Sequence, residues 1–310
     1  MESCEVLLYH SKFCPADGLA AKGRALADSL GGSLGILAPE DSGAAGQISA
    51  DILYTLSVGD MELQPEMAAG ILQQAIVQSG AKVVLLAATR TGNEIAARAA
   101  EALDAGCISE CLSLEIEAGH LQAKRDIYGG IAVGCFVSET AVTVCTVANG
   151  ALEEAVTGQP AAVEKLSLAP APAMKEIVST VPVEKSINLT KAKHIVSFGR
   201  GIAKQEDIAM VKKLAGAFDA EIGCSRPIAE ELKWLSSEHQ VGITGALVKP
   251  DLYMALGISG QVQHFAGMKG SKIIVAVNSN KQAPIFQFAD YGIVGDVYKV
   301  VPALLDAMQA

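Results

Sequence analysis

"LYMALGISGQVQHFAGM", residues 252–268, indicates the fold of the C-terminal half of the chain. Its first eight residues are mostly apolar and predict a buried strand, and the run that follows predicts a helix opening near residue 260. Polar side chains stand at the junction, namely Ser259, Gln261, Gln263 and His264. A helix interior does not need such residues, whereas a ligand at the end of a strand would use their hydrogen-bonding groups. The stretch therefore predicts an α/β unit with a binding site at the strand end.

Strands and helices alternate on both sides of this stretch. In the C-terminal part the sequence predicts further strands at 193–199, 220–225, 272–278 and 291–296, and helices at 204–218 and 297–308. In the N-terminal part, strands at 5–10, 33–39 and 81–89 alternate with helices at 17–30, 65–80 and 92–106. Such alternation is typical of doubly wound α/β domains with mostly parallel sheets.

Two stretches depart from this alternation. Residues 107–147 hold short β-like runs in succession, which predict a mixed extension of the first sheet. Residues 174–185 predict an edge strand that closes the sheet, because a proline such as Pro182 is tolerated at a sheet edge. With 310 residues the chain is too long for one ordinary core. We therefore expect two doubly wound domains, residues 1–188 and residues 189–310.

Charge and composition argue against several classes of protein. The net charge is −10 and the basic residues are scattered, so we expect no nucleic acid and no acidic membrane surface as partner. No apolar run approaches the roughly 20 residues that span a bilayer, so we expect no membrane insertion. The N-terminus enters a strand without a basic leader, which favours a cytoplasmic location. The seven cysteines lack metal-ligand spacing and predict free thiols and no metal.

Small and polar residues follow each predicted strand of the C-terminal domain, where ligands bind in open parallel sheets. They are Gly199, Arg200 and Gly201, Ser225 and Arg226, Ser259 and Gly260 with Gln263 and His264, then Asn278 and Asp296. The glycines would let backbone approach a phosphate, and helices opening near 260 and 297 would offer free N–H groups to a diphosphate. A phosphorylated, hydroxyl-rich nucleotide fits this set, although neither a G-x-G-x-x-G nor a Walker sequence is present.

The C-terminal half is similar to the alpha subunit of electron transfer flavoproteins. The resemblance rests on "QVGITG", "VKPDLYMALGISGQVQHFAGMKGSKIIVAVN" and "APIFQFADYGIVGDVYKVVP" in this order, and it covers roughly residues 193–304. The stretches "ATRTGNEIAARAAEAL" and "RDIYGGIAV" extend it more loosely into the N-terminal half. The resemblance implies a Rossmann-like C-terminal domain that binds FAD. It also implies an N-terminal α/β domain that associates with a separate beta subunit.

Carried over position by position, the resemblance assigns FAD contacts to the strand ends and to the loop at 241–244. The set is Arg200, Ser225, Arg226, Val241, Gly242, Ile243, Thr244, Ser259, Gly260, Gln261, Val262, Gln263, His264, Asn278, Asp296 and Val297. It implies that Arg226 lies beside the isoalloxazine, Thr244 near flavin N5, and His264 at the pyrimidine edge, where a cationic ring would stabilise negative charge. No catalytic residue is expected, because the flavin carries the redox chemistry.

One position departs from the family pattern. Ile243 stands where this loop commonly carries glutamine. Isoleucine cannot hydrogen-bond through its side chain, so its contact with flavin is expected to be backbone or packing. Together with "CSRPIAEELKW" at 224–234, it resembles the bacterial branch that serves anaerobic acyl-CoA or carnitine-type metabolism.

The resemblance implies an electron carrier rather than an enzyme. As a heterodimer with a beta subunit, the protein would take electrons from an acyl-CoA-type dehydrogenase and pass them to another redox protein. Two alternatives remain open. One is a subunit of an electron-bifurcating or NADH-oxidising complex, in which the second nucleotide site would belong to the partner. The other is a nucleotide-binding structural module without redox activity.

Overall fold

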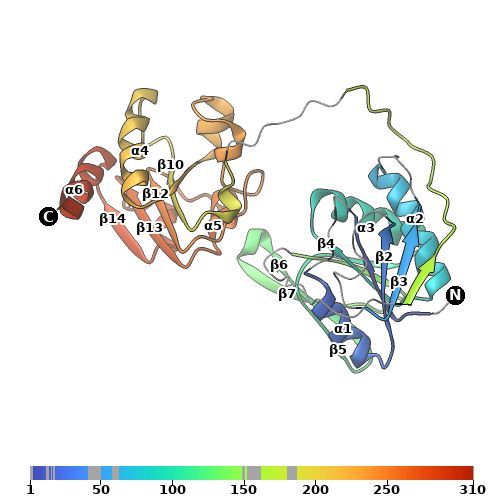
Figure 1. Ribbon diagram of the computed structural model, residues 1–310. Helices are drawn as coiled ribbons and strands as arrows, with labels where there is room; N and C mark the ends of the chain where they lie inside the picture. The colour runs from blue at the N-terminus through green and yellow to red at the C-terminus, as the bar shows by residue number, and fades with distance from the viewer. Residues whose placement is uncertain are drawn as a thin grey trace. The chain divides into compact units, whose positions relative to one another are not determined.

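The protein forms two units, Met1–Ser179 and Thr180–Ala310. They are seen in a computed structural model, which describes residues 3–11, 14, 16, 18–40, 50–57, 63–148, 151, 162–179 and 187–309. The division falls earlier in the chain than the boundary expected between residues 188 and 189. Each unit has its own sheet and its own hydrophobic clusters (Figure 1).

The first unit is built on a nine-stranded sheet within the described residues. Its strands are β1 (Val6–Tyr9), β2 (Leu34–Pro39), β3 (Ile52–Leu56), β4 (Val83–Ala87), β5 (Gly106–Glu117), β6 (His120–Ile127), β7 (Ala132–Val137), β8 (Thr143–Val147) and β9 (Ala162–Lys165). Their order is β7-β6-β5-β8-β4-β1-β2-β3-β9. Neighbours are parallel except in the pairs β5–β6 and β6–β7. The mixed extension predicted for residues 107–147 is confirmed.

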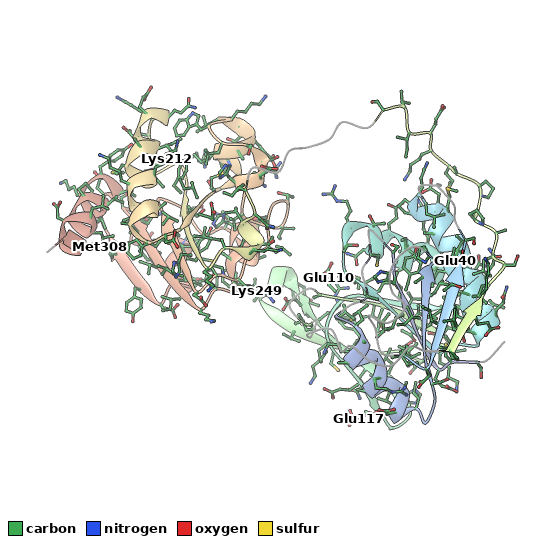
Figure 2. All side chains as sticks on the ribbon, in the orientation of Figure 1. Glu40, Glu110, Glu117, Lys212, Lys249 and Met308 are labelled. Atoms are coloured by element: carbon green, nitrogen blue, oxygen red, sulfur yellow. The ribbon has the colours of Figure 1, made fainter. Side chains whose placement is uncertain are left out.

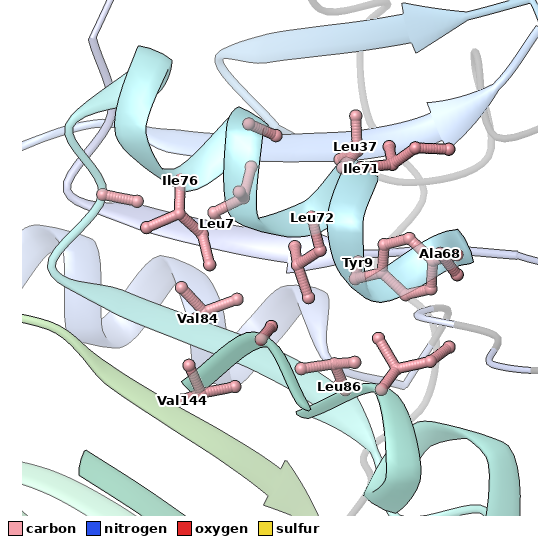
Figure 3. Close-up of a cluster of buried hydrophobic side chains, with 14 of the residues drawn as sticks. Leu7, Tyr9, Leu37, Ala68, Ile71, Leu72, Ile76, Val84, Leu86 and Val144 are labelled. Carbon is pink, nitrogen blue, oxygen red and sulfur yellow. The ribbon is translucent and has the colours of Figure 1, made fainter. Parts of the chain in front are cut away.

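Helices cover both faces of this sheet, as expected of a doubly wound domain. They are α1 (Ala20–Ser29), α2 (Pro65–Ser79) and α3 (Arg90–Ala102). Leu72 of α2 belongs to a buried cluster with Leu7 and Val84 on one face (Figure 3). Leu26 of α1 belongs to a second cluster with Leu8. Because successive strand residues point to opposite faces, Leu7 and Leu8 pack in clusters with different helices.

Local signals in the sequence set the ends of two of these helices. Pro65 occupies the first turn of α2, where its missing N–H is not needed. Gly80 ends α2 with φ of 70°, a conformation that favours glycine. The Thr89 side chain accepts a hydrogen bond from the Gly92 N–H at 2.9 Å and thereby caps α3.

The edge strand of the first sheet was predicted in the wrong place. The edge beside β3 is β9, and residues 174–179 form no strand. The remainder of the predicted strand, with Pro182, lies outside the described residues. Polar groups of 166–176 are bonded by α2 instead: Gln74 Nε2 donates to Ala169 O, and the Met174 N–H donates to Glu66. Helix side chains therefore satisfy backbone groups of this segment, including the Met174 N–H, for which a strand ladder was expected.

The second unit has a five-stranded sheet with all neighbours parallel. Its strands are β10 (His194–Phe198), β11 (Glu221–Cys224), β12 (Leu252–Leu256), β13 (Ile273–Asn278) and β14 (Tyr291–Val294). Its helices are α4 (Ile208–Ala217), α5 (Val262–Met268) and α6 (Val297–Gln309). Shorter turns of helix are η1 (Tyr128–Gly130) in the first unit and η3 (Leu189–Lys191), η4 (Gln205–Asp207), η5 (Pro227–Glu231), η6 (Ser237–His239) and η7 (Pro284–Gln287) around the second sheet.

Alternating strand residues divide the second unit into two cores. Met254 of β12 packs with α4 and α6, whereas its neighbour Tyr253 packs with α5 and η7. Lys212 and Met308 lie on the outer surfaces of α4 and α6 and are exposed (Figure 2). Among the residues that the structure describes, no helix combines the length and apolar character needed to cross a membrane.

Candidate functional site

The strand order of the second unit creates a switch point between two strands. The order is β11-β10-β12-β13-β14, so the chain moves from β10 to one neighbour and then returns to the other side of β10. The loops that leave the carboxyl ends of β10 and β12 therefore run in opposite directions. Crevices at such points are where open α/β sheets bind ligands. The residues predicted from the sequence stand on these loops and on those of the neighbouring strands.

Backbone hydrogen bonds join the loops into one continuous edge. Gly199 donates to Leu256 O at 2.9 Å, and Gly201 donates to Gly257 O at 3.1 Å. The same kind of contact continues along the sheet, from Ser225 to Phe198, from Ile243 to Gln263, from Ile285 to Ser259 and from Gly295 to Asn278. The structure thus brings together the predicted segments that start at residues 199, 225, 241, 259, 278 and 295.

The glycines of this edge have a reason that the sequence did not reveal. A Cβ on Gly201 would lie 2.5 Å from Gly257 Cα, and a Cβ on Gly199 would lie 2.7 Å from Gly257 O. A Cβ on Gly260 would lie 2.3 Å from the Ile285 nitrogen. The loop after β10 thus packs against the loop after β12, which in turn packs against the backbone at Ile285. Close packing of neighbouring backbone is therefore a second reason for these glycines, beside the predicted approach of a phosphate.

The helix at the end of β12 opens later than predicted. Its first residue is Val262 and its N-cap is Gln261, whereas an opening near residue 260 was expected. The N-cap side chain makes no capping hydrogen bond. Residues 257–261 therefore form a loop between strand and helix, and Ser259 lies on this loop with its side chain exposed.

The loop at 241–244 presents a hydroxyl group that a buried amide orients. Gln240 is 2% exposed, and its Nε2 donates to Thr244 Oγ1 at 2.8 Å. A hydroxyl that accepts this bond keeps its own hydrogen for another acceptor. Thr244 is itself exposed, as is Ile243 at 52%. The loop can therefore donate one hydrogen bond beside an apolar surface.

His264 lies in the first turn of α5 and is held by a tyrosine beneath it. Tyr253 Oη and His264 Nε2 are 2.9 Å apart, and both side chains are buried. Burial lowers the pKa of His264 to about 4, against a smaller opposing effect of the Val241 backbone. The ring is therefore neutral at pH 7. This corrects the expectation of a cationic His264 and leaves it the hydrogen bonds and dipole of a neutral imidazole.

The far end of the edge is occupied by internal bonds. Asn278 Nδ2 donates to Ile258 O at 2.9 Å, so this side chain braces the loop after β12. Asp296 Oδ1 accepts the Tyr298 N–H at 3.0 Å at the start of α6. The Tyr298 N–H is therefore not among the free N–H groups that the start of this helix was expected to offer.

The predicted side chains divide into those that face solvent and those that do not. Arg200 and Ser259 are exposed, and within the described residues their side chains make no hydrogen bond or ion pair. Arg226 is exposed but is paired with Glu230, with 2.7 Å between Nε and Oε2. Several others are buried and could reach a ligand only through backbone or one edge: Ser225, Val241, Gly242, Gly260, His264 and Val297. Gln261, Val262 and Gln263 are exposed at the start of α5.

This donor set fits FAD by its chemistry. A diphosphate needs cations and N–H donors, and the unpaired Arg200 on a glycine-bounded turn supplies a cation. Ribityl oxygens need hydroxyl and amide partners, such as Ser259 and Gln263. A flat ring system needs exposed apolar surface, and Ile243 and Val262 are exposed on loops joined by the bond from Ile243 N to Gln263 O.

Two contributors to this site were missed in the sequence. The sequence predicts Tyr253 only as a strand residue, and its pairing with His264 spans eleven positions, from a strand to the following helix. Gln240 precedes the recognised loop, and its four-residue spacing to Thr244 was the one available signal. Neither residue belongs to a motif whose side-chain partner can be found without the fold.

Comparison with known proteins shows which family the chain matches. Residues 188–269 match the electron transfer flavoprotein FAD-binding domain, and residues 18–171 match the electron transfer flavoprotein domain. The chain is 40% identical over 279 residues to the protein FixB of Escherichia coli O7:K1, with 88% of each chain covered. It belongs to the electron transfer flavoprotein family. It is also 39% identical over 259 residues, 83% of each chain, to YdiR of Escherichia coli K12, which is named for an electron transfer flavoprotein subunit.

Membership in this family establishes the general role. The chain is an alpha-type electron transfer flavoprotein subunit, an electron carrier rather than an enzyme, and its cofactor is FAD. Alpha-type subunits of this family generally pair with a beta subunit. The match to the family's FAD-binding domain, residues 188–269, falls within the second unit.

Proposed function

We propose that this electron transfer flavoprotein subunit holds FAD at the carboxyl edge of its second sheet and receives electrons from an acyl-CoA-type dehydrogenase. The proposed FAD contacts are Arg200, Ser225, Arg226, Val241, Gly242, Ile243, Thr244, Ser259, Gly260, Gln261, Val262, Gln263, His264, Asn278, Asp296 and Val297. One observation carries the proposal: backbone hydrogen bonds join the loops of successive strands into a single edge. A cytoplasmic location remains our expectation.

The residues of this edge have separate tasks in the proposal. Arg200 would neutralise phosphate charge, because it is exposed and has no partner among the described side chains. Thr244 would donate its hydroxyl hydrogen, which Gln240 leaves free. His264 would present a neutral ring fixed by Tyr253. FAD supplies the electron transfer itself, and these residues bind it, orient it and adjust its reduction potential through hydrogen bonds and dipoles.

Arg226 enters the proposal through an exchange of partners. Its guanidinium is bound to Glu230 on the next turn, and both side chains are largely exposed. An exposed pair of this kind contributes little stability, about 0.3–0.5 kcal/mol for i,i+4 spacing on a helix. Release of Arg226 toward a flavin therefore has a small cost.

The two alternative functions differ in what a purified complex would contain. An electron-bifurcating or NADH-oxidising complex would hold a second FAD per heterodimer and oxidise NADH. A structural module would bind its nucleotide fully, contain no FAD and therefore be colourless. Membership in a flavoprotein family makes that alternative unnecessary. Cofactor content, visible spectrum and NADH oxidation of the chain co-purified with its beta subunit distinguish a simple carrier from a bifurcating complex.

Removal of two exposed donors tests the proposed contacts. The double variant Arg200→Ala, Ser259→Ala is expected to weaken FAD binding by about 1–3 kcal/mol, since hydrogen bonds to a charged group are lost. The measurement is an FAD titration of the heterodimer stripped of cofactor. Lys212→Ala removes an exposed cation from the outer side of α4 and should bind FAD like the parent. If the double variant binds FAD with the affinity of the parent, the assignment of these two contacts is wrong.

We further propose that the beta subunit covers the β6–β7 hairpin of the first unit. β7 is an edge strand of the sheet, and most of its residues are exposed. The hairpin and its turn expose large apolar side chains: Tyr128, Ile131, Val133, Phe136 and Val137. Several large exposed apolar side chains gathered in one segment are typical of a protein interface. Association with a second subunit would bury this surface.

Charge placed on this hairpin tests the proposed interface. The double variant Ile131→Asp, Val133→Asp is expected to weaken association with the beta subunit by about tenfold or more, because apolar contact is replaced by buried charge. Sedimentation of the two-subunit mixture over a concentration series measures the effect. Val77→Asp changes an equally exposed apolar residue on α2 and serves as control. Unchanged association of the hairpin variant would place the beta subunit elsewhere.

A further inference from the structure

We infer that Tyr298 and Asp207 form a clasp that holds the loop carrying Arg200, which makes Tyr298 a positioning residue for FAD binding. The inference rests on the proposed function, because it assumes that Arg200 contacts the cofactor. Tyr298 itself lies in the first turn of α6 and touches the loop rather than the proposed ligand edge. Neither Tyr298 nor Asp207 belongs to the set predicted from the sequence.

The clasp consists of two hydrogen bonds on one hydroxyl group. The Ala203 N–H donates to Tyr298 Oη at 2.8 Å, and Tyr298 Oη donates to Asp207 Oδ2 at 2.6 Å. The tyrosine hydroxyl thus acts as acceptor and donor at once. Burial and the bond to Asp207 raise the pKa of Tyr298, so the hydroxyl keeps its proton.

The clasp joins two segments that are not neighbours in the sheet. Ala203 and Asp207 lie between β10 and α4, whereas Tyr298 follows β14. In the sheet, β12 and β13 stand between β10 and β14, so no ladder bond connects these two strand ends. Helix α6 packs with α4 in the same core, and this packing brings the Tyr298 side chain to Ala203 and Asp207. Its own backbone is fixed in turn, because the Tyr298 N–H is capped by Asp296.

Arg200 lies between two anchored points of its loop. Gly199 and Gly201, the residues directly before and after Arg200, are bonded to Leu256 at the end of β12 and to Gly257 in the loop after it. Two residues further along, Ala203 is bonded to Tyr298. The Arg200 side chain has no partner among the described residues. The position of its guanidinium therefore depends on where the backbone of this loop places the residue. Beyond Ala203, the turn η4 leads directly into α4, and the Asp207 N–H donates to Lys204 O within it.

Removal of one oxygen atom tests the clasp. In the heterodimer stripped of cofactor, Tyr298→Phe is expected to raise the Kd for FAD about threefold to tenfold, the loss expected from one or two hydrogen bonds. Tyr291→Phe is the matched control, because Tyr291 is 65% exposed on the neighbouring β14 and should bind FAD like the parent. Asp207→Ala removes the acceptor of the Tyr298 hydroxyl and should also weaken FAD binding. This second variant tests the clasp if Tyr298→Phe does not fold.

A double variant separates positioning from general loosening. If the clasp acts through Arg200, then adding Tyr298→Phe to Arg200→Ala should change the Kd by less than about twofold. Equal effects of Tyr298→Phe in both backgrounds would overturn the inference. Amide hydrogen exchange of residues 200–207 should be faster in Tyr298→Phe than in Tyr291→Phe.

The same titrations distinguish failure of the clasp from failure of the proposed site. If Arg200→Ala weakens FAD binding while Tyr298→Phe and Asp207→Ala bind like the parent, the clasp is overturned and the proposed site stands. If Arg200→Ala also binds like the parent, both are overturned.

Discussion

Replacement of Gly257 by alanine is expected to destabilise the second unit by about 2–5 kcal/mol and to remove FAD binding. Gly257 has φ of 60°, which alone disfavours a residue with a side chain. A Cβ at this position would also lie 2.5 Å from Gly201 Cα. The obstructing atoms belong to the backbone, so no flexible side chain can move aside. The loops after β10 and β12 would have to separate, and the switch point between them would open.

Tryptophan fluorescence can follow this unit separately. The chain has a single tryptophan, Trp234, which packs against the core of the second unit. Urea unfolding monitored at Trp234 should show a lower midpoint for Gly257→Ala. The control is Gly216→Ala in α4, where a Cβ would meet nothing within 4 Å. This control should be neutral or gain up to about 1 kcal/mol from helix propensity. A parent-like midpoint for Gly257→Ala would show that the loops are not closely packed.

Acidification is expected to destabilise the second unit through His264. Its pKa in the folded protein is about 4, against an ordinary value of 6.5. Between these values the unfolded chain binds the proton more readily than the folded one. The contribution is therefore fully present above pH 6.5 and is lost as the pH falls toward 4. Over that window the loss amounts to about 3 kcal/mol, from about 1.4 kcal/mol per unit of pKa difference.

A variant without a titrating ring isolates this effect. His264→Gln retains hydrogen-bonding groups beside Tyr253 but cannot gain the imidazole charge. Its stability, followed through Trp234, should decline less between pH 6.5 and pH 4 than that of the parent. His120→Gln alters an exposed histidine of β6 in the first unit and should leave the profile of the second unit unchanged. Identical slopes for the parent and His264→Gln would mean that His264 is not held neutral by burial.

Much of the fold was accessible from local patterns. The continuous apolar run at 81–89 predicted a covered parallel strand, and β4 has parallel neighbours on both sides. Gly80 correctly marked the end of α2. The edge strand predicted at 174–185 is wrong for residues 174–179, because an extended segment looks the same in the sequence whether it joins a sheet or contacts a helix. What separates the two cases is a distant partner, here Glu66 of α2 for the Met174 N–H.

The candidate site divides in the same way. Parallel strands bring their carboxyl ends to one edge, so the residues after each predicted strand can be grouped from the sequence alone. The surroundings of each side chain cannot be predicted in this way. Arg200 and Arg226 look alike in the sequence, yet one has no partner among the described side chains and the other is bound to Glu230. His264 looks like a possible cation in the sequence, and only its burial shows that the ring is neutral.

The sequence by itself determined the alternation of strands and helices, the family, the cofactor and the edge at which that cofactor is expected. The alternation and the edge follow from spacing and residue type, which local chain geometry translates directly into structure. The family and the cofactor follow from the resemblance of residues 193–304 to electron transfer flavoproteins. Only the tertiary structure decided why Gly201 and Gly257 must be glycines, which charges are free, and how Tyr298 reaches Asp207. Each of these depends on contact between segments distant in the chain, and contact at that range is determined by how the whole unit packs.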